Sequence, residues 1–263
     1  MEARLLGKLI IEGLIEAKTG LRIGGAQGGL RIGTVDLNVV TDPSGKPYVP
    51  GSTLKGKLRS LLEYAMNCGF NENGGHMCAA EEDYKKCVPC RLFGIAPGSA
   101  AFSVPTLTRL LVSDAPLANA DKLAEWHKQG NIELAYTEVK SETAIDRVMG
   151  KSKEKTLRQV ERVPAGAEIA FRLILNVLSK EDLDELVRPV FEAMQLVEDD
   201  YLGGMGSRGY GRVKFKGLKV WWNSAADYRA GVTDTAAKPA LNGEMAVPAA
   251  VLKGFEELRK AIG

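Results

Sequence analysis

Four potential metal ligands lie close together in the first third of the chain. His76 and Cys78 are separated by one residue, and Cys87 and Cys90 by two. Structural zinc sites favour a tetrahedral set of three thiolates and an imidazole, or of four thiolates. The spacing of His76 and Cys78 is tighter than in a usual zinc finger, so Cys68 is an alternative to His76 as the fourth ligand. We predict a structural zinc site without catalysis, because four protein ligands leave no open coordination position.

Two other interpretations of these cysteines remain open. Cys87-Val-Pro-Cys90 has the spacing of a thioredoxin-like redox pair, but it lacks the βαβ context in which such a pair opens a helix. The other alternative is a set of unrelated thiols in a loop. A zinc ion would supply order to residues 67–97, which read as an irregular insertion with almost no apolar core of its own.

A glycine-rich stretch followed by a basic helix offers a second kind of chemistry. Five glycines lie between Gly24 and Gly33, and Ser52 is placed to cap a helix on which Lys55 and Arg59 share a face. Glycine lets backbone N–H groups approach a polyanion closely, and a helix N-terminus attracts phosphate. The stretch therefore indicates a phosphate-binding loop, although it is not a Walker A loop, because no Gly-Lys-Ser/Thr follows the glycines. The alternative is a surface hairpin followed by an ordinary amphipathic helix.

A second glycine-rich segment lies near the end of the chain. The three glycines of residues 204–209 match the spacing of a dinucleotide-binding fingerprint. That fingerprint requires a strand, a loop and then a helix, whereas this segment follows a predicted helix and precedes a predicted strand. What remains is a run of backbone N–H groups beside Arg208, Tyr210 and Arg212, which suits a sugar–phosphate chain with a base or sugar against the tyrosine. A tight connection with solvated arginines is the alternative.

Two further features are weaker when taken from the residues alone. Residues 147–162 contain six Lys or Arg against two Glu, which is typical of a solvated hairpin. Asp36 is a single acid inside an apolar run, and such a residue is usually part of a turn or a cap. No nucleophile–base pair accompanies Asp36, and no acid pair for two metal ions is evident.

The elements that must position these residues follow from the apolar periodicity. Strands are predicted at residues 4–18, 102–113, 132–140, 168–178 and 210–222. Helices are predicted at residues 52–67 and 180–198, with Ser179 capping the second, and a short helix within 114–130. The helix at 180–198 carries one apolar stripe, formed by Leu183, Leu186, Val187, Val190, Phe191, Met194 and Val197. The strand at 168–178 has Ile169, Phe171, Leu173, Leu175 and Val177 on one face. The order strand, helix, strand, inserted hairpin, strand, helix, strand is that of an α+β, ferredoxin-like or RRM-like split βαβ fold.

This plan divides the chain into one large domain and an extension. Residues 1–222 form the domain, with insertions at about 67–97 and 137–165. Residues 223–263 form the extension, which we expect to be flexible up to residue 243 and to end in an amphipathic helix.

The composition is that of a globular protein and is compatible with nucleic-acid binding. The 263 residues are 45% hydrophobic and 26% charged, with a formal net charge of +2. A nucleic-acid binder has such a balance when its cations gather on one face. No apolar run is long enough to span a membrane and no signal peptide is evident, so we expect a cytoplasmic protein.

Several of these segments together resemble the backbone subunit of type III-A (Csm) CRISPR effectors, which belongs to the RAMP superfamily. The matching segments run from about residue 4 to about residue 222 in the family's order. They include Asp36 and residues 20–25, 48–59, 136–140, 144–147 and 203–212.

The resemblance implies the same fold and an RNA-guided endoribonuclease activity. In that family an aspartate at the position of Asp36 is needed for cleavage of the target RNA. The implied reaction is a metal-dependent attack by the adjacent ribose 2′-OH, with Mg²⁺ or Mn²⁺ as cofactor. Asp36 would orient that hydroxyl, take its proton or hold the metal ion. Arg22 stands where some relatives carry a histidine; it can stabilise phosphate charge but cannot act as a base at pH 7.

The resemblance also implies residues that hold RNA. Lys140, Arg147 and Arg162 match positions of a thumb-like hairpin that interrupts the guide–target duplex, and Met149 is our candidate for a wedge between bases. The residues expected to contact RNA outside that hairpin are Arg22, Ser52, Lys55, Lys57, Arg59, Ser207, Arg208, Tyr210 and Arg212.

The partners implied are a CRISPR RNA, a complementary target RNA and further copies of the chain. A small helical subunit, end-capping RAMP subunits and a large polymerase-like subunit complete the assembly. The main alternative is a non-catalytic guide-binding subunit of the same kind of complex. A repeat-processing RAMP nuclease usually needs a histidine near the glycine loop, and none lies between residues 1 and 75. A zinc hydrolase requires that one of the four zinc ligands be absent.

Overall fold

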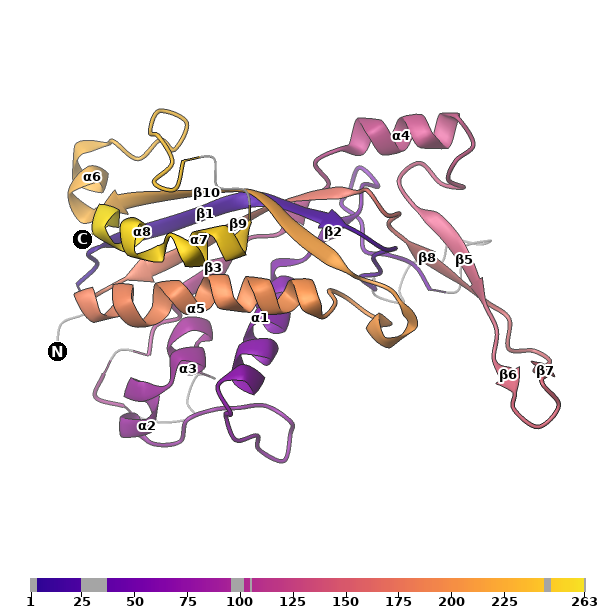
Figure 1. Ribbon diagram of the computed structural model, residues 1–263, viewed down its shortest axis with the longest axis horizontal. Helices are drawn as coiled ribbons and strands as arrows, with labels where there is room; N and C mark the ends of the chain where they lie inside the picture. Colours follow the sequence, from indigo (N-terminus) through magenta and orange to yellow (C-terminus); the bar gives the residue numbers. More distant parts are fainter. Residues whose placement is uncertain (1–3, 25–36, 96–101, 105, 244–246, 263) are drawn as a thin grey trace.

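A four-stranded antiparallel sheet forms the centre of the molecule. The structure, a computed structural model, describes residues 4–24, 37–95, 102–104, 106–243 and 247–262. The strands β1 (Gly7–Ala17), β3 (Leu110–Val112), β9 (Glu168–Val177) and β10 (Val213–Ser224) lie in the order β10-β1-β9-β3. Helix α1 (Gly51–Ala65) connects β1 to β3, and α5 (Lys180–Asp199) connects β9 to β10 (Figure 1). This is the predicted split βαβ arrangement.

The core forms where the apolar side of the sheet meets the two helices. Alternate residues of β1 and β9 are buried, as the period of two along a strand requires. Phe171 of β9 and Phe215 of β10 pack edge to face, with ring centroids 5.3 Å apart. Helix α5 packs on α1 and on both strands. Its buried stripe is the one predicted from sequence: Leu183, Leu186, Val187, Val190, Phe191, Met194 and Val197.

The two main helices begin in different ways. Helix α5 has a complete capping box, in which Ser179 Oγ accepts from the Asp182 N–H and Asp182 Oδ2 accepts from the Ser179 N–H, both at 3.3 Å. The predicted Ser52 cap of α1 is wrong, because the helix starts at Gly51 after Pro50 and has no side-chain cap of its own. Asp114, far along the chain, instead accepts from the Gly51 N–H at 2.7 Å.

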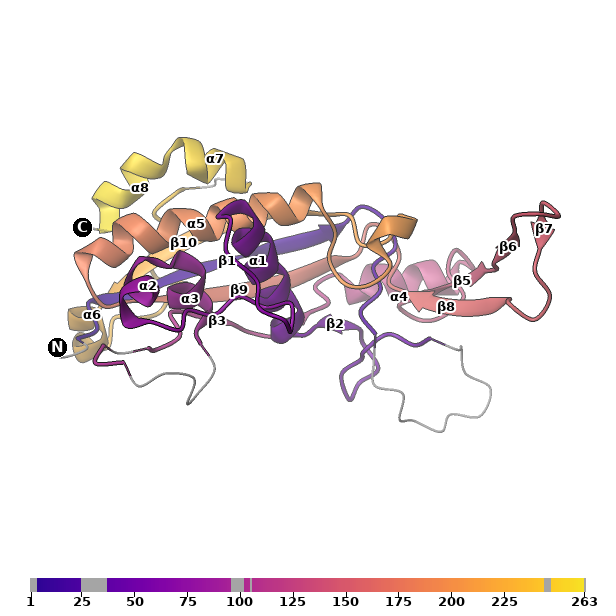
Figure 2. The ribbon, with the colours of Figure 1, turned by 90° about the horizontal axis from the view of Figure 1, so that it is seen from below.

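A thin arm leaves the body beyond the end of the sheet (Figures 1 and 2). We call residues 138–162 the arm: β5 (Glu138–Glu142) pairs with β8 (Arg158–Arg162), and β6 (Ile145–Asp146) pairs with β7 (Lys151–Ser152) near the tip. The strand predicted at 132–140 is therefore displaced toward the arm. Helix α4 (Ala120–Lys128) lies beside the arm's base.

The strand predicted at 102–113 is shorter than expected. Only Leu110–Val112 pairs with β9, because the chain before it turns to the insertion, where the Arg109 N–H donates to the carbonyl of Arg91 at 3.4 Å. The insertion carries two short helices, α2 (Glu81–Lys86) and α3 (Val88–Phe93). Nearer the arm, β2 (Tyr48–Val49) pairs with β4 (Ala115–Pro116).

The C-terminal extension folds back on the domain. Helix α6 (Ala225–Ala230) follows β10, and the segment after it is held by bonds such as Trp221 Nε1 to the carbonyl of Lys238 at 3.1 Å. These contacts correct the expectation of a flexible segment. The terminal helix is divided into α7 (Pro248–Lys253) and α8 (Phe255–Ile262), which both pack on α5. None of the helices in the described part of the chain is long and apolar enough to cross a bilayer.

Candidate nucleic-acid interface and metal centre

The four predicted metal ligands lie together in the insertion. The ligand atoms of His76, Cys78, Cys87 and Cys90 are all within 4.8 Å of one another. His76 Nε2 is 3.2 Å from Cys87 Sγ and 3.7 Å from Cys78 Sγ. Cys68 lies outside this set. Within the described ranges this is the one such group that is close enough to hold a metal ion.

The surroundings of the cluster also fit a cation. His76 Nδ1 lies 2.8 Å from the carbonyl oxygen of Gly69, which leaves Nε2 free to face the thiols. Burial raises the pKa of the Cys78 thiol to about 11. A hydrogen bond with Cys87 and burial raise the pKa of Cys90. Without metal, the raised pKa values favour the protonated thiols. A bound cation favours the thiolates instead, because the thiolate is the form that coordinates metal.

The redox alternative lacks the context that it requires. Cys87 and Cys90 do open a helix, α3, but the element before it is the helix α2 and no strand leads into the pair. The imidazole of His76 and the thiol of Cys78 lie beside the pair. The cysteine pair is therefore part of a cluster of four potential ligands, which suits a metal ion better than an isolated redox pair.

Arg59 connects the insertion to α1. Its Nε donates to Glu63 at 2.6 Å, and its two terminal nitrogens donate to the carbonyl oxygens of Gly94 at 3.0 Å and His76 at 2.7 Å. Glu63 is only 5% exposed. The guanidinium of Arg59 is therefore engaged within the fold, and the carbonyl that it holds belongs to a metal ligand.

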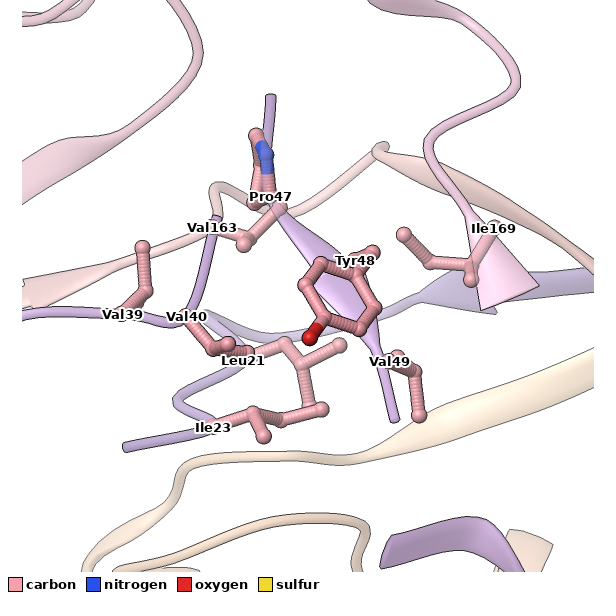
Figure 3. Close-up of a pocket in the computed structure, with 9 residues that line it drawn as sticks. All are labelled: Leu21, Ile23, Val39, Val40, Pro47, Tyr48, Val49, Val163 and Ile169. Atoms are coloured by element: carbon pink, nitrogen blue, oxygen red, sulfur yellow. The ribbon is translucent and has the colours of Figure 1, made fainter. Parts of the chain in front are cut away.

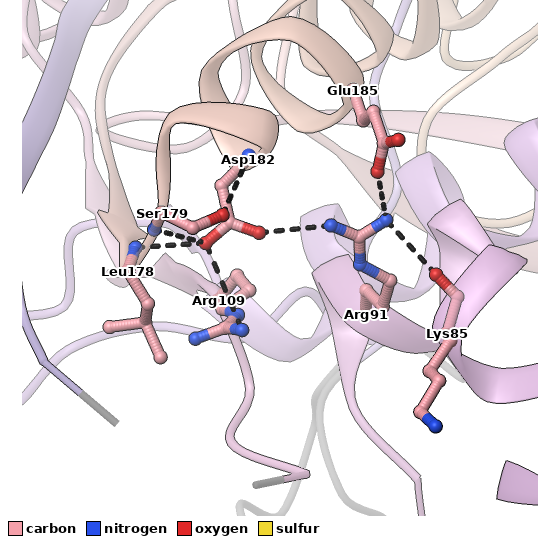
Figure 4. Close-up of polar contacts among 7 residues, drawn as sticks. All are labelled: Lys85, Arg91, Arg109, Leu178, Ser179, Asp182 and Glu185. Atoms are coloured by element: carbon pink, nitrogen blue, oxygen red, sulfur yellow. Dashed lines mark hydrogen bonds and ion pairs between the residues drawn. The ribbon is translucent and has the colours of Figure 1, made fainter. Parts of the chain in front are cut away.

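Arg91, which directly follows the ligand Cys90, connects the insertion to α5 (Figure 4). It donates to Asp182 at 2.9 Å and to the carbonyl of Lys85 at 3.2 Å, and it forms an ion pair with Glu185. Asp182 belongs to the capping box that starts α5. Two arginines thus hold the insertion to the domain: Arg59 from α1 and Arg91 from α3.

Residues 20–24, the described start of the first glycine stretch, meet the second glycine-rich segment at the arm end of the sheet. The Gly204 N–H donates to the carbonyl of Arg22 at 2.8 Å, and the Gly211 N–H donates to the carbonyl of Gly20 at 2.9 Å. Gly203 has a φ of +81°, and a Cβ there would lie 2.3 Å from the oxygen of Arg22. These glycines are therefore needed for close backbone packing.

Arg22 lies at this junction. A Cβ added at Gly24 or Gly204 would come within 3.4 Å of its guanidinium, so the two glycines leave space beside it. Its buried Nε has no hydrogen-bond partner among the described residues. An arginine with an unsatisfied donor beside two glycines is suited to a phosphate oxygen.

The three cations of α1 are not all available to bind a ligand. The side chain of Lys55 makes no ion pair or hydrogen bond with another described residue, and partial burial and the nearby Arg59 lower its pKa. Lys57 instead pairs with Asp200 at 2.9 Å and lies 3.8 Å from the ring centroid of Tyr201. Ser52 is exposed in the first turn. Of the three cations predicted on this helix, Lys55 is the one free to meet a ligand.

Tyr210 is not the surface ring that the sequence suggested. It is only 1% exposed, and its hydroxyl donates to Glu142 at 2.8 Å. Lys140 Nζ and the Arg162 guanidinium lie 4.6 and 5.0 Å from its ring centroid. A base therefore cannot stack on Tyr210 in this structure, because the arm covers the ring.

The remaining predicted RNA contacts are on the surface. Ser207 and Arg208 lie in the short 3₁₀ helix η1 (Gly206–Arg208), and Arg212 follows; all three are exposed. Arg147 is exposed near the arm tip, as is Met149. The cations of the arm's base, of η1 and of Arg22 lie around one junction.

Asp36 lies outside the described residues, but the next residue is placed. Leu37 forms a bridge with Val160 of β8, and its carbonyl accepts from the Glu161 N–H at 3.0 Å. Val39 and Val40 then line a small apolar hollow with Tyr48 and the sheet edge (Figure 3). This hollow is too apolar for an RNA site and serves to pack residues 39–49 against the fold.

Sequence reasoning missed Glu142, Arg158 and Asp114. Glu142 accepts from Arg158 at 2.9 Å and lies 3.6 Å from Arg208. No local pattern identifies it, because its partners come from η1 and from the opposite strand of the arm. The only available signal was its place four residues after Glu138 on a predicted hairpin.

Comparison with known proteins agrees with this architecture. The RAMP superfamily profile matches residues 14–214. A protein of Methanocaldococcus jannaschii named CRISPR system Cms endoribonuclease Csm3 is 38% identical over 216 residues, covering 82% of each chain. A protein of the same name from Mycobacterium tuberculosis is 36% identical over 234 residues, covering 81% of this chain and 88% of the relative.

Similarity extends to a solved structure. A crystal structure of a Csm3–Csm4 subcomplex from the type III-A CRISPR-Cas interference complex superposes with a TM-score of 0.60 at 27% identity, covering 99% of both chains. The family profile spans most of the sheet and both glycine segments, and the relatives cover most of their own length. The chain therefore belongs to the RAMP superfamily and, within it, to the Csm3 family.

Proposed function

We propose that this chain is the guide-binding backbone subunit of a type III CRISPR effector and that it cleaves RNA complementary to the guide. Relatives that are named as endoribonucleases align with more than four-fifths of this chain. The observation that supports the proposal is the junction of residues 20–24 with the second glycine segment at the base of the arm, where the buried Nε of Arg22 has no hydrogen-bond partner among the described residues.

The guide backbone would lie along this junction. Four cations at this junction or on α1 are either unpaired among the described residues or exposed: Arg22, Lys55, Arg208 and Arg212. Such contacts supply affinity without reading sequence, because they address phosphate. Ser207 would add a hydroxyl donor from the same loop. Lys57 and Arg59 would contribute through the fold, by holding α1 in place.

Asp36 would perform the cleavage with Mg²⁺ or Mn²⁺. A carboxylate oxygen is the ligand that these hard cations prefer, and the metal would neutralise charge developing on the phosphate. Leu37, the neighbour of Asp36, is fixed to β8 at the arm's base.

The arm would interrupt the guide–target duplex at short intervals. Val148 is 93% exposed at the tip, and Met149 beside it is also exposed, which suits apolar contact with bases or with the next copy of the chain. Arg147 would hold a phosphate nearby. Copies of the chain would polymerise along the guide, with the small helical, end-capping RAMP and large polymerase-like subunits as further partners, in the cytoplasm.

The insertion would hold one structural Zn²⁺ through His76, Cys78, Cys87 and Cys90. Zinc is the metal that best fits three thiolates and an imidazole at these separations. Its role would be to order the insertion, since few apolar side chains pack there.

Asp36→Ala tests the catalytic assignment. Assembled complex is incubated with labelled complementary RNA and Mg²⁺, and the products are resolved at single-nucleotide resolution. We expect the variant to bind guide and target but to give no periodic cuts. Asp121→Ala, at an exposed position of α4, is the matched control and should cut like wild type. Persistent cuts in Asp36→Ala contradict the assignment, and no cuts in wild type favour a non-catalytic guide-binding subunit.

A further inference from the structure

Tyr210 joins the arm to the second glycine segment by side-chain contacts. Its hydroxyl donates to Glu142 Oε1 at 2.8 Å, across 68 residues of sequence. Lys140 and Arg162, one from each strand of the arm, place their cations over its ring at 4.6 and 5.0 Å. A buried tyrosine in the body thus contacts both strands of the arm.

Glu142 collects cations from three elements. It accepts from Arg158 of β8 at 2.9 Å and lies 3.6 Å from Arg208 of η1 and 3.8 Å from Lys140 of β5. Its side chain is 13% exposed. Removing such a carboxylate leaves like charges facing one another, so Glu142 keeps these cations together at the arm's base.

The arm beyond this joint has little other support. Leu37 forms a backbone bridge with Val160 of β8, and Leu21 forms one with Val163 just after β8. From Glu142 outward, by contrast, the described contacts of the arm are within the arm itself, such as Ala144 N–H to Thr156 Oγ1 at 3.1 Å, apart from those of Glu142. The view in Figure 2 shows the arm projecting away from the sheet.

A small rotation at the base produces a large displacement at the tip. Val148 lies six positions after Glu142, which allows a reach of at most about 20 Å along the chain. A rotation of roughly 10° about the base would move the tip by up to about 3.5 Å, which is of the order of one nucleotide step along a stacked strand. A change of this size in the arm's angle would therefore shift the tip by about one nucleotide step.

We propose that Tyr210 and Glu142 form an orienting joint that sets the angle of the arm and hence the nucleotide at which the arm enters the duplex. They are positioning residues and act through the arm. This inference rests on the proposed function for its consequence on cleavage, but the joint itself is a property of the isolated chain.

The protonation states suit a permanent joint. Burial, followed by the hydrogen bond to Glu142, raises the pKa of Tyr210 to about 12. The same hydrogen bond is the main cause that lowers the pKa of Glu142. The donor therefore keeps its proton and the acceptor its charge throughout the physiological pH range.

Two conservative variants separate the hydrogen bond from the charge. Tyr210→Phe removes the hydroxyl and keeps the buried ring with both cations over it. Glu142→Gln keeps an oxygen acceptor for the hydroxyl and removes the charge that holds Arg158 and Arg208. Tyr228→Phe, on a partly exposed tyrosine of α6, is the control.

The first measurement is hydrogen exchange of residues 143–157 in the full-length protein without RNA. We expect both test variants to accelerate exchange there by about tenfold or more, because a hydrogen bond to a charged group is worth at least that factor. Exchange of β1 should stay as in wild type. Arm exchange equal to wild type in both variants overturns the joint, whatever the nuclease assay shows.

The second measurement is the position of cuts in complementary RNA by assembled complex. We expect cuts at one nucleotide per interval in wild type and Tyr228→Phe, and cuts spread over neighbouring nucleotides in Tyr210→Phe. A purely structural role would instead lower the midpoint and the total cleavage together, without moving the cuts. Faster arm exchange with unmoved cuts refutes the role in positioning. No cuts in wild type refute the proposed nuclease and, with it, the consequence of the joint for cleavage.

Discussion

The Arg59→Ala variant tests whether Arg59 stabilises the fold or binds RNA. Arg59 makes three hydrogen bonds of 2.6 to 3.0 Å, and its loss leaves the carboxylate of Glu63 without a cation. Removing one partner of a buried pair costs about 3–5 kcal/mol. Because the Arg59 side chain is 27% exposed, water offsets part of this cost, and we expect about 2–4 kcal/mol of lost unfolding free energy. For a chain of this size that is a fall in Tm of roughly 5–15 °C.

The assay is thermal and urea unfolding of the zinc-loaded protein, followed by circular dichroism. Lys55→Ala, one turn away on the same helix, is the matched control and should change the unfolding free energy by no more than about 0.5 kcal/mol. Adding Glu63→Gln to Arg59→Ala should recover about 1–2 kcal/mol, because the uncompensated charge is then removed. An Arg59→Ala variant that keeps the wild-type Tm and loses only RNA affinity would refute this reasoning and restore the guide-binding role predicted from sequence.

Three other expectations concern the metal, the guide and pH. Plasma emission after dialysis should find about one zinc per chain in wild type and none in Cys87→Ser/Cys90→Ser; a folded, metal-free wild type contradicts the centre. Lys55→Ala and Arg208→Ala should each lower the salt slope of guide binding by roughly 0.7, equally for two unrelated guides, in filter binding. The pKa of Glu142 is lowered in the folded state, so its stabilisation is present above its unperturbed value of about 4.3 and is lost as pH falls through the folded value. The difference in unfolding free energy between wild type and Glu142→Gln should accordingly be constant at pH 6–8 and shrink in acid; a difference that grows in acid reverses the sign.

Local pattern was enough to predict the elements with strong periodicity. The stripe of α5, its Ser179 cap and the alternation of β9 each depend on neighbours within a few residues, and the structure confirms all three. The cluster of His76, Cys78, Cys87 and Cys90 could also be predicted from sequence, because closely spaced Cys and His residues are typical of metal sites. The order of these elements was sufficient to predict the split βαβ sheet.

Contacts between distant segments decided the rest. Ser52 is a good capping residue by type, but Pro50 and Asp114 start α1, and Asp114 is 63 residues from the N–H that it accepts from. Arg59 and Lys55 are alike in sequence as cations of one helix face. Only the fold shows that the insertion folds back over Arg59 and leaves Lys55 free.

The same division applies to the candidate RNA interface. Two glycine segments, a set of cations and a hairpin can be identified from the sequence, because glycine, charge and turn patterns are local properties. Tertiary structure decided that Gly204 donates to Arg22, that Tyr210 is buried, and that Glu142 holds cations from β5, β8 and η1. The physical reason is that burial and pairing depend on which surfaces the chain brings together, and a residue type does not carry that information.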